Sequence, residues 1–463
     1  MKTKIRNLHF VGIGGAGMSG IAEVMLNQGF NVQGSDINDS IATKRLSQLG
    51  AKIFLGHSPK NVSGADVCVV SSAIEDDNSE LKQAKKIKIP IVPRAQMLAE
   101  LMRFKKGIAV AGSHGKTTTT SLITSILASA GFDPTYVLGG RLCGTSIGAK
   151  LGKSDFLVVE ADESDGSFLK LSPMMAVITN IDKDHLNFFE NDFSKLKGAF
   201  ISFAHTIPFY GPVIVFIDDP AIRGIISRIS RPVIGVGFTN NADIKATKIQ
   251  FQGLTTNFLV KQKNYEDIKI KIPMSGKHNI LNSLLAIAVA RELNIKNKEI
   301  SKALVRFKGV ERRFQFLGDF ITPLGKKFSL IDDYGHHPNE IKATISACRE
   351  AFHRRKIFLI FQPHRYSRTR DLLSEFATVL SKADSLVLLD VYPAGEKKIS
   401  SADSKSLSKL IRKKGKVVPV NCKKSKDVLD VFGSILNQND VLLIMGAGTI
   451  SSLPKMITNL CSV

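Results

Sequence analysis

The chain has 463 residues, of which 43% are hydrophobic and 23% charged, so it is long enough for about three globular domains of ordinary soluble composition. The formal net charge of +23 indicates anionic ligands, either nucleic acid or polyanionic small molecules. The densest basic run, residues 405–426, contains no aromatic residues and is typical of a solvated helix face. Nucleic-acid binding is therefore not expected.

The five cysteines lie far apart and show no C-x-x-C spacing, which argues against a disulfide framework or a thiolate metal site. An apolar stretch near the N-terminus is interrupted by glycines from residue 12 onward, unlike the core of a signal peptide. No apolar run approaches the about 20 residues that a membrane span needs. These features predict a cytoplasmic protein that does not insert into membranes.

The first hundred residues alternate strand-like and helix-like patterns, which predicts a parallel sheet of Rossmann type. After the first predicted strand, residues 7–12, glycines stand at positions 12, 14 and 17, and Asp36 ends the next strand. This spacing is typical of a loop that binds a nucleotide phosphate and of an acid that binds ribose, although tight strand-to-helix packing alone also explains it. Ser71 ends a further strand, and His57 either faces the same crevice or lies on the surface.

A second α/β unit opens with a predicted strand at residues 107–111, the loop GSHGKT at 112–117 and a predicted helix at 118–130. The loop is a variant of the P-loop, because Val110 occupies the place of the usual first glycine. The essential parts remain: Lys116 can bridge the β- and γ-phosphates of a nucleoside triphosphate, and Thr117 can bind Mg²⁺. We therefore predict that this unit binds and hydrolyses a nucleotide.

Carboxylates follow the next strand of this unit, which we predict at residues 156–160. Glu160 is the first acid beyond the apolar run, and we expect it to be the second oxygen ligand of the magnesium ion. The other acids of the segment 160–165 are interpreted as loop acids that face solvent. His185 follows a third strand and is either structural or a ligand of a second metal ion.

The remaining chain turns from period-two patterning over residues 243–273 to an apolar helix at 279–293, and then to a third α/β unit with four predicted strands. These strands lie at residues 328–332, 357–361, 386–390 and 441–445. We place the domain boundaries near residues 105 and 318. The predicted α/β fold has three domains, a Rossmann-like one at 1–104, a central P-loop ATPase-type one at 105–317 and a C-terminal Rossmann-like one at 318–463.

Three polar segments remain that apolar packing does not require: residues 276–279, 311–313 and 332–338. A fourth, QPHRYSRTR at 362–370, delivers three arginines into a short loop after a strand. Such a loop suits bidentate binding of a carboxylate or phosphate, and a solvated basic loop is the alternative.

Together these motifs closely resemble the Mur ligase superfamily along almost the whole chain. The motifs that carry the resemblance are GIGGAGMSG at 12–20, GSHGKTTT at 112–119, EADESD at 160–165, TNI at 179–181, DH at 184–185, DDYGHHP at 332–338, FQPHRYSRTR at 361–370 and DVYPAGE at 390–396. The resemblance implies an ATP-dependent ligase of peptidoglycan precursor synthesis. It would form an amide between the lactyl carboxylate of UDP-N-acetylmuramate and L-alanine through an acyl phosphate.

The resemblance also implies roles for individual residues, with ATP and Mg²⁺ as cofactors and Mn²⁺ as an alternative ion. The residues expected to bind ATP are Gly112, Ser113, His114, Gly115, Lys116, Thr117, Thr118, His278, Asn279, Asn282 and Asp332. The residues expected to bind the sugar nucleotide or alanine are Gly14, Gly17, Asp36, His57, Ser71, Tyr334, His336, Arg365 and Arg368. The metal ligands would be Thr117, Glu160 and His185, and the catalytic residues Lys116, His185, Arg313 and His336.

Three alternatives stay open at this point. A recycling ligase that attaches a murein tripeptide to the same sugar nucleotide would carry nearly the same motifs. A nucleotide-dependent dehydrogenase would explain the first glycine loop and leave Lys116 without a role. A basic ATPase that binds nucleic acid would explain the net charge, and its binding would weaken steeply with salt.

Overall fold

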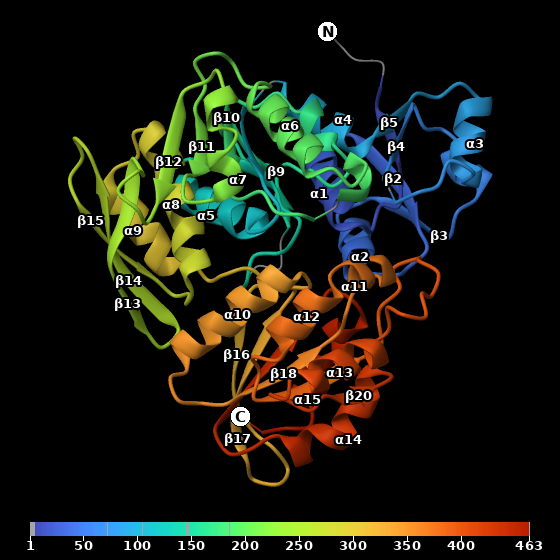
Figure 1. Cartoon of the computed structure of the whole chain (residues 1–463). Helices are drawn as coiled ribbons and strands as arrows, with labels where there is room; N and C mark the ends of the chain where they lie inside the picture. Colours follow the sequence, from blue (N-terminus) through green and yellow to red (C-terminus); the bar gives the residue numbers. More distant parts are fainter. Residues whose placement is uncertain (1–4, 72, 104, 145–147, 185, 463) are drawn as a thin grey trace. The chain divides into compact units, whose positions relative to one another are not determined.

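The computed structural model describes residues 5–71, 73–103, 105–144, 148–184 and 186–462 (Figure 1). The chain forms two compact units. The first comprises Met1–Thr247, Leu259–Ile270 and Leu281–Lys308, and the second comprises Lys248–Phe258, Lys271–Ile280 and Gly309–Val463. The first unit contains the two glycine loops, and the second contains the arginine-rich segment.

The N-terminal part of the first unit is a five-stranded parallel sheet in the order β3-β2-β1-β4-β5. Its strands are β1 (Asn7–Val11), β2 (Asn31–Asp36), β3 (Lys52–Leu55), β4 (Val67–Val70) and β5 (Ile91–Pro93). Its helices are α1 (Ala16–Asn27), α2 (Ile41–Gln48), α3 (Ser79–Lys86) and α4 (Arg94–Met102), with a short 3₁₀ turn η1 (Pro59–Val62). The strand order reverses beside β1, and ligands of such sheets bind at that point. The predicted Rossmann-like sheet is confirmed.

The second sheet has ten strands in the order β15-β14-β13-β12-β11-β10-β6-β9-β7-β8. Its strands are β6 (Lys106–Ala111), β7 (Thr135–Val137), β8 (Ala149–Lys150), β9 (Phe156–Glu160), β10 (Met175–Ile178), β11 (Val213–Phe216), β12 (Val233–Gly237), β13 (Ile244–Gln252), β14 (Thr255–Gln262) and β15 (Ile268–Ile272). The helices of this region are α5 (Lys116–Ser129), α6 (Phe193–Ala204), α7 (Pro220–Arg223), α8 (Lys277–Glu292) and α9 (Asn297–Arg306), with the 3₁₀ turns η2 (Ser167–Lys170), η3 (Leu186–Phe189) and η4 (Ile226–Arg228). β6 pairs in parallel with β9 and β10, so the three carboxyl ends lie at one edge.

The period-two patterning and the helix predicted after it are both confirmed. In β15 every second residue is buried, as expected for a sheet with one solvated face. Helix α8 begins at Lys277, two residues earlier than predicted. Helix α5 also begins two residues earlier than predicted, at Lys116, with Gly115 as its N-cap.

The second unit contains a six-stranded sheet in the order β16-β17-β21-β18-β19-β20, parallel except for the antiparallel pair β16 and β17. Its strands are β16 (Gln315–Ile321), β17 (Lys327–Asp333), β18 (Ile357–Phe361), β19 (Ser385–Leu389), β20 (Val420–Cys422) and β21 (Asp440–Met445). Its helices are α10 (Pro338–Ala351), α11 (Tyr366–Asp371), α12 (Leu373–Leu380), α13 (Ser404–Lys413), α14 (Ser425–Ile435) and α15 (Leu453–Thr458), with η5 (Thr449–Ser452). All residues of β18 and β21 are buried, which is why they read as continuous apolar runs. The edge strands β16 and β20 were not predicted from the sequence.

The first part of the basic run lies on the solvated side of α13 (Ser404–Lys413). On α13, Leu407 and Ile411 are buried, while Lys405 and Lys409 are exposed. The spacing of the buried pair matches one helix face, so the charges occupy the opposite face. Among the residues that the structure describes, no helix combines the length and apolar character required to cross a membrane.

Candidate active site

The loop after β6 has a backbone that only glycine accepts at two positions. Gly112 and Gly115 have φ values of 128° and 83°, in the left-handed region. A Cβ on Gly112 would lie 2.1 Å from Oγ1 of Thr179, and one on Gly115 would lie 2.6 Å from Oδ1 of Asn282. The loop therefore delivers the N-terminus of α5, with its unpaired N–H groups, to an anion.

Residues at the end of β10 brace this loop. The N–H of His114 donates to Oδ1 of Asn180 at 2.9 Å, and Nδ2 of Asn180 donates to the carbonyl of His114 at 2.9 Å. Oγ1 of Thr179 donates to the same carbonyl at 2.6 Å. The ring of His114 lies 3.1 Å from the carboxylate of Asp182. These bonds fix the conformation of the loop in the absence of a ligand. The N–H of Asp182 also donates to Oγ of Ser113, so the loop packs against the acidic segment that follows β10.

Lys116 is paired with a buried acid. Its Nζ donates to the carbonyl of Gly112 at 2.6 Å and to both carboxylate oxygens of Glu163, at 3.0 and 2.8 Å. Burial opposes the charge, but the carboxylates of Glu163 and Asp162 outweigh it and raise the pKa of Lys116. Glu163 is only 1% exposed, so the interpretation of this acid as a solvent-facing loop residue is wrong. Its pairing with Lys116 keeps the lysine charged at all physiological pH values.

Glu160 and Thr117 lie together at the next strand end. Oγ1 of Thr117 donates to Oε2 of Glu160 at 3.1 Å, and the N–H of Gly139 donates to Oε1 at 2.5 Å. The pairing of Val110 with Glu160 in the sheet places the acid beside the P-loop. A hydroxyl and a carboxylate oxygen are ligands that Mg²⁺ accepts, so this pair fits the ion. His185, predicted as a further ligand, lies outside the described residues.

The first glycine loop is closed by residues of three strand ends. The N–H of Gly14 donates to Oδ2 of Asp36 at 2.9 Å, and a Cβ on Gly14 would lie 2.9 Å from the same oxygen. Ser71 follows β4, and its N–H donates to the carbonyl of Val11 at 3.3 Å. The structure thus brings together Gly14, Asp36 and Ser71 at the carboxyl edge of β1, β2 and β4.

Arg94 is a residue of this region that the sequence analysis missed. It is the first residue of α4, and a Cβ on Gly17 would lie 2.4 Å from its Nη1, so Gly17 leaves room for the guanidinium. Nη2 of Arg94 donates to the carboxylate of Asp162 at 3.2 Å. Burial opposes the charge of Asp162. The positive charges of Lys116 and Arg94 and a hydrogen bond from Ser164 outweigh burial and lower the pKa of Asp162 to about 2. The sequence around Arg94 gives no signal for this contact, because its partner Asp162 is 68 residues away in the chain.

A cavity of about 240 Å³ connects the two glycine loops. Its lining includes Gly17 and Arg94 from the N-terminal α/β region and Lys116, Glu160 and Asp162 from the region of the second sheet. A second cavity of about 180 Å³ is lined by Gly14, Glu23, Arg45 and Gly139, among others. Since Gly139 lines both cavities, they are neighbours. The two glycine loops that the sequence predicts to bind nucleotides therefore open onto adjoining cavities.

His57 belongs to a polar network around Glu80, a residue of α3 that is fully buried. Its Nδ1 lies 3.0 Å from Oγ of Ser35 and 3.5 Å from Oε2 of Glu80. His9 and Asn61 contact the same carboxylate at 3.2 and 2.6 Å. Burial opposes the charge of Glu80, but hydrogen bonds from His9, Ser35 and Asn61 outweigh it and lower the pKa of Glu80 to about 2.

Acid should weaken the fold through Glu80. Because its pKa falls from the usual 4.5 to about 2 in the folded state, its contribution is complete above pH 4.5 and is lost as the pH falls towards 2. That contribution is on the order of 3 kcal/mol in the free energy of unfolding. His9 and His57, which face the carboxylate, share this network. Urea unfolding between pH 2 and 7 should show a flatter acid limb for Glu80→Gln than for the exposed control Glu100→Gln, and equal limbs would contradict this account.

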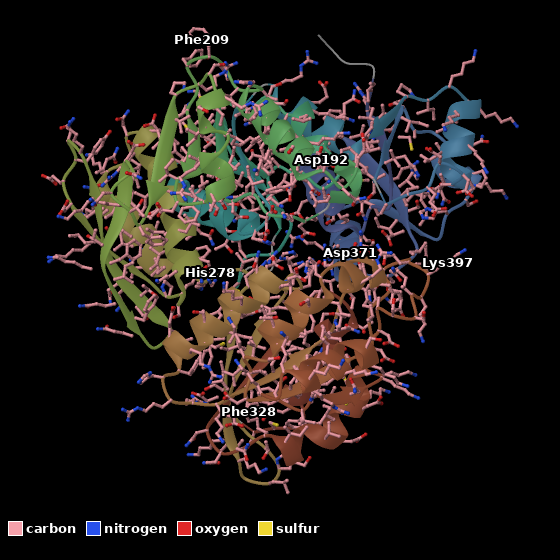
Figure 2. The ribbon with its side chains drawn as sticks, viewed as in Figure 1. Asp192, Phe209, His278, Phe328, Asp371 and Lys397 are labelled. Atoms are coloured by element: carbon pink, nitrogen blue, oxygen red, sulfur yellow. The ribbon has the colours of Figure 1, made fainter. Side chains whose placement is uncertain are left out.

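Three predicted ATP-binding residues lie on α8. In the first unit, Oδ1 of Asn282 accepts from Oγ1 of Thr119 at 3.2 Å, so Asn282 contacts the P-loop helix. In the second unit, Nδ2 of Asn279 donates to the carbonyl of Ser275 at 2.7 Å. Burial lowers the pKa of His278 to about 4, so its ring is neutral at pH 7. Figure 2 labels His278 near the start of α8.

In the second unit, the end of β17 carries two buried acids. Oδ2 of Asp332 accepts from Nε of Arg312 at 3.0 Å, while Oδ1 is buried without a partner among the described residues. Asp333 accepts the N–H groups of Phe314 and Gly335, both at 2.7 Å. Burial, only partly offset by Arg313 and these N–H groups, raises the pKa of Asp333 to about 6. The unpartnered oxygen of Asp332 is available to a ligand donor.

Aromatic and cationic side chains gather at the same edge of this sheet. The guanidinium of Arg313 lies 5.1 Å from the ring of Tyr334, and the ring of Tyr334 lies 5.4 Å from that of His336. The ring of His336 lies 5.4 Å from that of His364, which follows β18 and which the sequence analysis did not select. Burial and the nearby Arg368 and Arg365 lower the pKa of His364 to about 4.

The arginine-rich loop is fixed by its backbone. Arg365 has a φ value of 70°, unusual for a residue with a side chain, and its N–H donates to the carbonyl of Tyr392 at 2.8 Å. Glu396 accepts from the N–H of Ser367 at 2.9 Å and from its hydroxyl at 2.6 Å. The structure thus brings Tyr334 and His336, which follow β17, and Arg365 and Arg368, which follow β18, to one edge of the sheet, and the anion that this edge would bind remains a prediction.

Three family models match the sequence in order. They are the catalytic domain of the Mur ligase family over residues 7–106, the Mur ligase middle domain over 110–290 and the Mur ligase glutamate ligase domain over 312–448. The chain belongs to the Mur ligase family. The three-domain α/β organisation is confirmed, while the boundaries near 105 and 318 remain a prediction.

Individual Mur ligases are similar along the whole chain. A UDP-N-acetylmuramate–L-alanine ligase of Thiobacillus denitrificans is 50% identical over 453 residues, which cover 98% of both proteins. The crystal structure of a UDP-N-acetylmuramate–alanine ligase from Thermotoga maritima superposes with a TM-score of 0.81 at 29% identity, over 98% of both chains. A murein peptide ligase from Psychrobacter arcticus has a TM-score of 0.72 at 23% identity, over 98% of both chains, and shares the fold.

Proposed function

We propose that this Mur ligase joins L-alanine to UDP-N-acetylmuramate at the expense of ATP, as a step in building peptidoglycan precursors in the cytoplasm. The observation that carries the proposal is the cavity that Gly17 lines from one glycine loop and Lys116 and Glu160 line from the other. Two anionic nucleotides held by the two loops would meet there. Similarity at 50% identity to a ligase of that name supports the choice of substrates.

In the proposed reaction, a lactyl carboxylate oxygen attacks the γ-phosphorus of ATP and ADP leaves. The neutral alanine amine then attacks the carbonyl carbon of the acyl phosphate, the C–O bond to phosphate breaks, and the nitrogen gives up one proton to leave an amide with a single N–H. Activation is needed because a carboxylate carries negative charge and has no good leaving group. Lys116 would stabilise the charge on the transferred phosphoryl group, and the N-terminus of α5, with Gly112, Ser113, His114, Gly115 and Thr118, would hold the triphosphate.

Thr117 and Glu160 would hold Mg²⁺, because their oxygens lie 3.1 Å apart and are both suited to that ion. When bound, the ion neutralises charge on the phosphate oxygens. His185 is proposed as a ligand of a second ion, and Mn²⁺ as a substitute for Mg²⁺. Asn282 contacts the P-loop helix and would bind adenosine together with His278, Asn279 and Asp332.

On the sugar-nucleotide side, Gly14, Gly17, Asp36, His57 and Ser71 would face the UDP moiety or its sugar. Asp36 already fixes the N–H of Gly14, so its main role would be to shape the loop. Arg313 would contact the transferring phosphate. Tyr334, His336, Arg365 and Arg368 would form the alanine site, with an arginine on the amino-acid carboxylate.

Arg365→Ala should raise the KM for L-alanine about tenfold or more, because a charge-assisted bond to the substrate carboxylate is lost. The KM for ATP should stay unchanged. Steady-state kinetics with each substrate varied in turn checks this, with the exposed Arg370→Ala as the matched control. Equal KM values for alanine in the variant and the wild type would place the carboxylate elsewhere.

The overall proposal is tested by phosphate release from ATP and Mg²⁺ in the presence of UDP-N-acetylmuramate. Release that depends on L-alanine is expected. Release only with the murein tripeptide would assign the chain to the recycling ligases, whose fold it shares. NAD reduction or stimulation of ATP hydrolysis by nucleic acid would contradict both assignments.

A further inference from the structure

The carboxylate of Glu80 is surrounded by hydrogen-bond donors. Oε2 accepts from the hydroxyl of Ser35 at 2.5 Å and contacts Nε2 of His9 at 3.2 Å, while Oε1 accepts from Nδ2 of Asn61 at 2.6 Å and from the N–H of Ser58 at 3.2 Å. Glu80 and Ser35 are both completely buried. An ionised carboxylate can only accept, so every one of these neighbours must donate to it.

This requirement determines which ring nitrogen of His57 carries the hydrogen. A serine hydroxyl has one hydrogen, and Ser35 gives it to Glu80. Oγ of Ser35 can then act only as an acceptor towards Nδ1 of His57, which lies 3.0 Å away. Nδ1 of His57 must therefore carry the hydrogen, and in the neutral ring Nε2 has a free lone pair.

The free nitrogen of His57 has no partner among the described residues. The ring is 19% exposed and follows β3, next to the strand that ends in Asp36. Three large apolar side chains are exposed near these strand ends: Ile37 is 69% exposed, Ile41 71% and Leu55 74%. In the sheet, Leu55 pairs directly with Asp36. An acceptor nitrogen close to exposed apolar surface suits a nucleoside, which has a flat ring and several O–H or N–H donors.

We propose that Ser35 and Glu80 are positioning residues that hold the hydrogen of His57 on Nδ1, so that Nε2 accepts a hydrogen bond from the nucleoside of the sugar nucleotide. The nature of the ligand rests on the proposed function, whereas the position of the hydrogen does not. The ligand donor is either the imide N–H of uracil or the 2′-hydroxyl of the ribose. CDP, which lacks the imide N–H, and 2′-deoxy-UDP distinguish these two sources.

A purely structural role for the network makes a different prediction. If Glu80 only stabilised the packing of α3, Ser35→Ala would lower the free energy of unfolding without changing the selectivity between nucleotides. The proposal instead links the Ser35 hydroxyl to recognition of one ligand group.

The first test is ¹⁵N NMR of the full-length protein labelled at histidine, with His57→Gln used to assign the ring. We expect a protonated Nδ1 and an unprotonated Nε2 in the free wild-type protein. A hydrogen on Nε2 overturns the proposal, and this readout is taken on the wild-type protein without a ligand.

The second test measures the affinity of UDP, CDP and 2′-deoxy-UDP by calorimetry. Ser35→Ala should weaken UDP about tenfold, and the analogue that lacks the donor should bind the wild type weakly and respond little to the substitution. The control is Ser63→Ala, which removes an exposed hydroxyl in the same domain. Unchanged UDP affinity in Ser35→Ala, or equal wild-type affinities for all three nucleotides, overturns the proposal. If the wild type binds no uridine nucleotide while NMR places the hydrogen on Nδ1, the proposed function fails and the assigned hydrogen position stands.

Discussion

Replacing Lys116 by alanine should reduce ATP-dependent ligation by about 10³-fold or more, because a partly buried cation that is proposed to stabilise the transferred phosphoryl group is lost. Nζ of Lys116 lies 2.6 Å from the carbonyl of Gly112, directly on the loop that would hold the triphosphate. The affinity for the sugar nucleotide should change little, since the residues proposed to bind it are on the other glycine loop. Single-turnover ligation and calorimetry with UDP-N-acetylmuramate measure the two effects separately.

The same substitution would also leave Glu163 buried and charged without a partner, which can cost about 3–5 kcal/mol in the free energy of unfolding. The double variant Lys116→Ala/Glu163→Gln removes both charges and should recover most of that stability while remaining inactive. Lys170→Ala, an exposed lysine of η2, is the matched control and should keep full activity. Recovery of ligation in the double variant would show that Lys116 acts through folding and would sink its proposed catalytic role.

Replacing Glu160 by glutamine should reduce the turnover of ligation by about 10²- to 10³-fold and raise the Mg²⁺ concentration needed for half-maximal activity. Oε2 of Glu160 accepts from Thr117 and Oε1 from Gly139, so an amide can replace only one of these acceptors. The neutral side chain also removes one charge from the proposed Mg²⁺ ligands. A Mg²⁺ titration of phosphate release at saturating ATP measures this effect.

Asp165→Asn is the matched control, because Asp165 is on the same segment and accepts from the N–H of Ser167. It should leave the Mg²⁺ titration unchanged. A normal titration curve for Glu160→Gln would mean that this carboxylate is not a metal ligand in the active protein.

The local patterns of the sequence were sufficient to predict the α/β class and the two loops. Strands such as β18 and β21 are buried on both faces, so each appears as an unbroken apolar run. Gly112 and Gly115 can be recognised in the sequence because few residues other than glycine adopt the left-handed backbone conformation that the loop requires. Lys116 and Thr117 come shortly after the end of β6, and Glu160 ends β9, so polar residues that follow apolar runs were enough to select them. The edge strands β16 and β20 were missed because they are short or irregular, and β16 contains a change of register near Gly318.

The contacts that complete the candidate site depend on the tertiary structure. Arg94 meets Asp162, Lys116 meets Glu163, and Ser35 meets Glu80 across 68, 47 and 45 residues of chain. None of these pairs has a characteristic spacing, since the distance in sequence depends on how many elements lie between two strand ends. The order of the strands brings them together, and burial then makes each charge require a partner. The sequence by itself thus determined the α/β class, the buried central strands, the glycine loops and the family resemblance, whereas the tertiary structure decided which acids hold which cations and where the hydrogen of His57 lies.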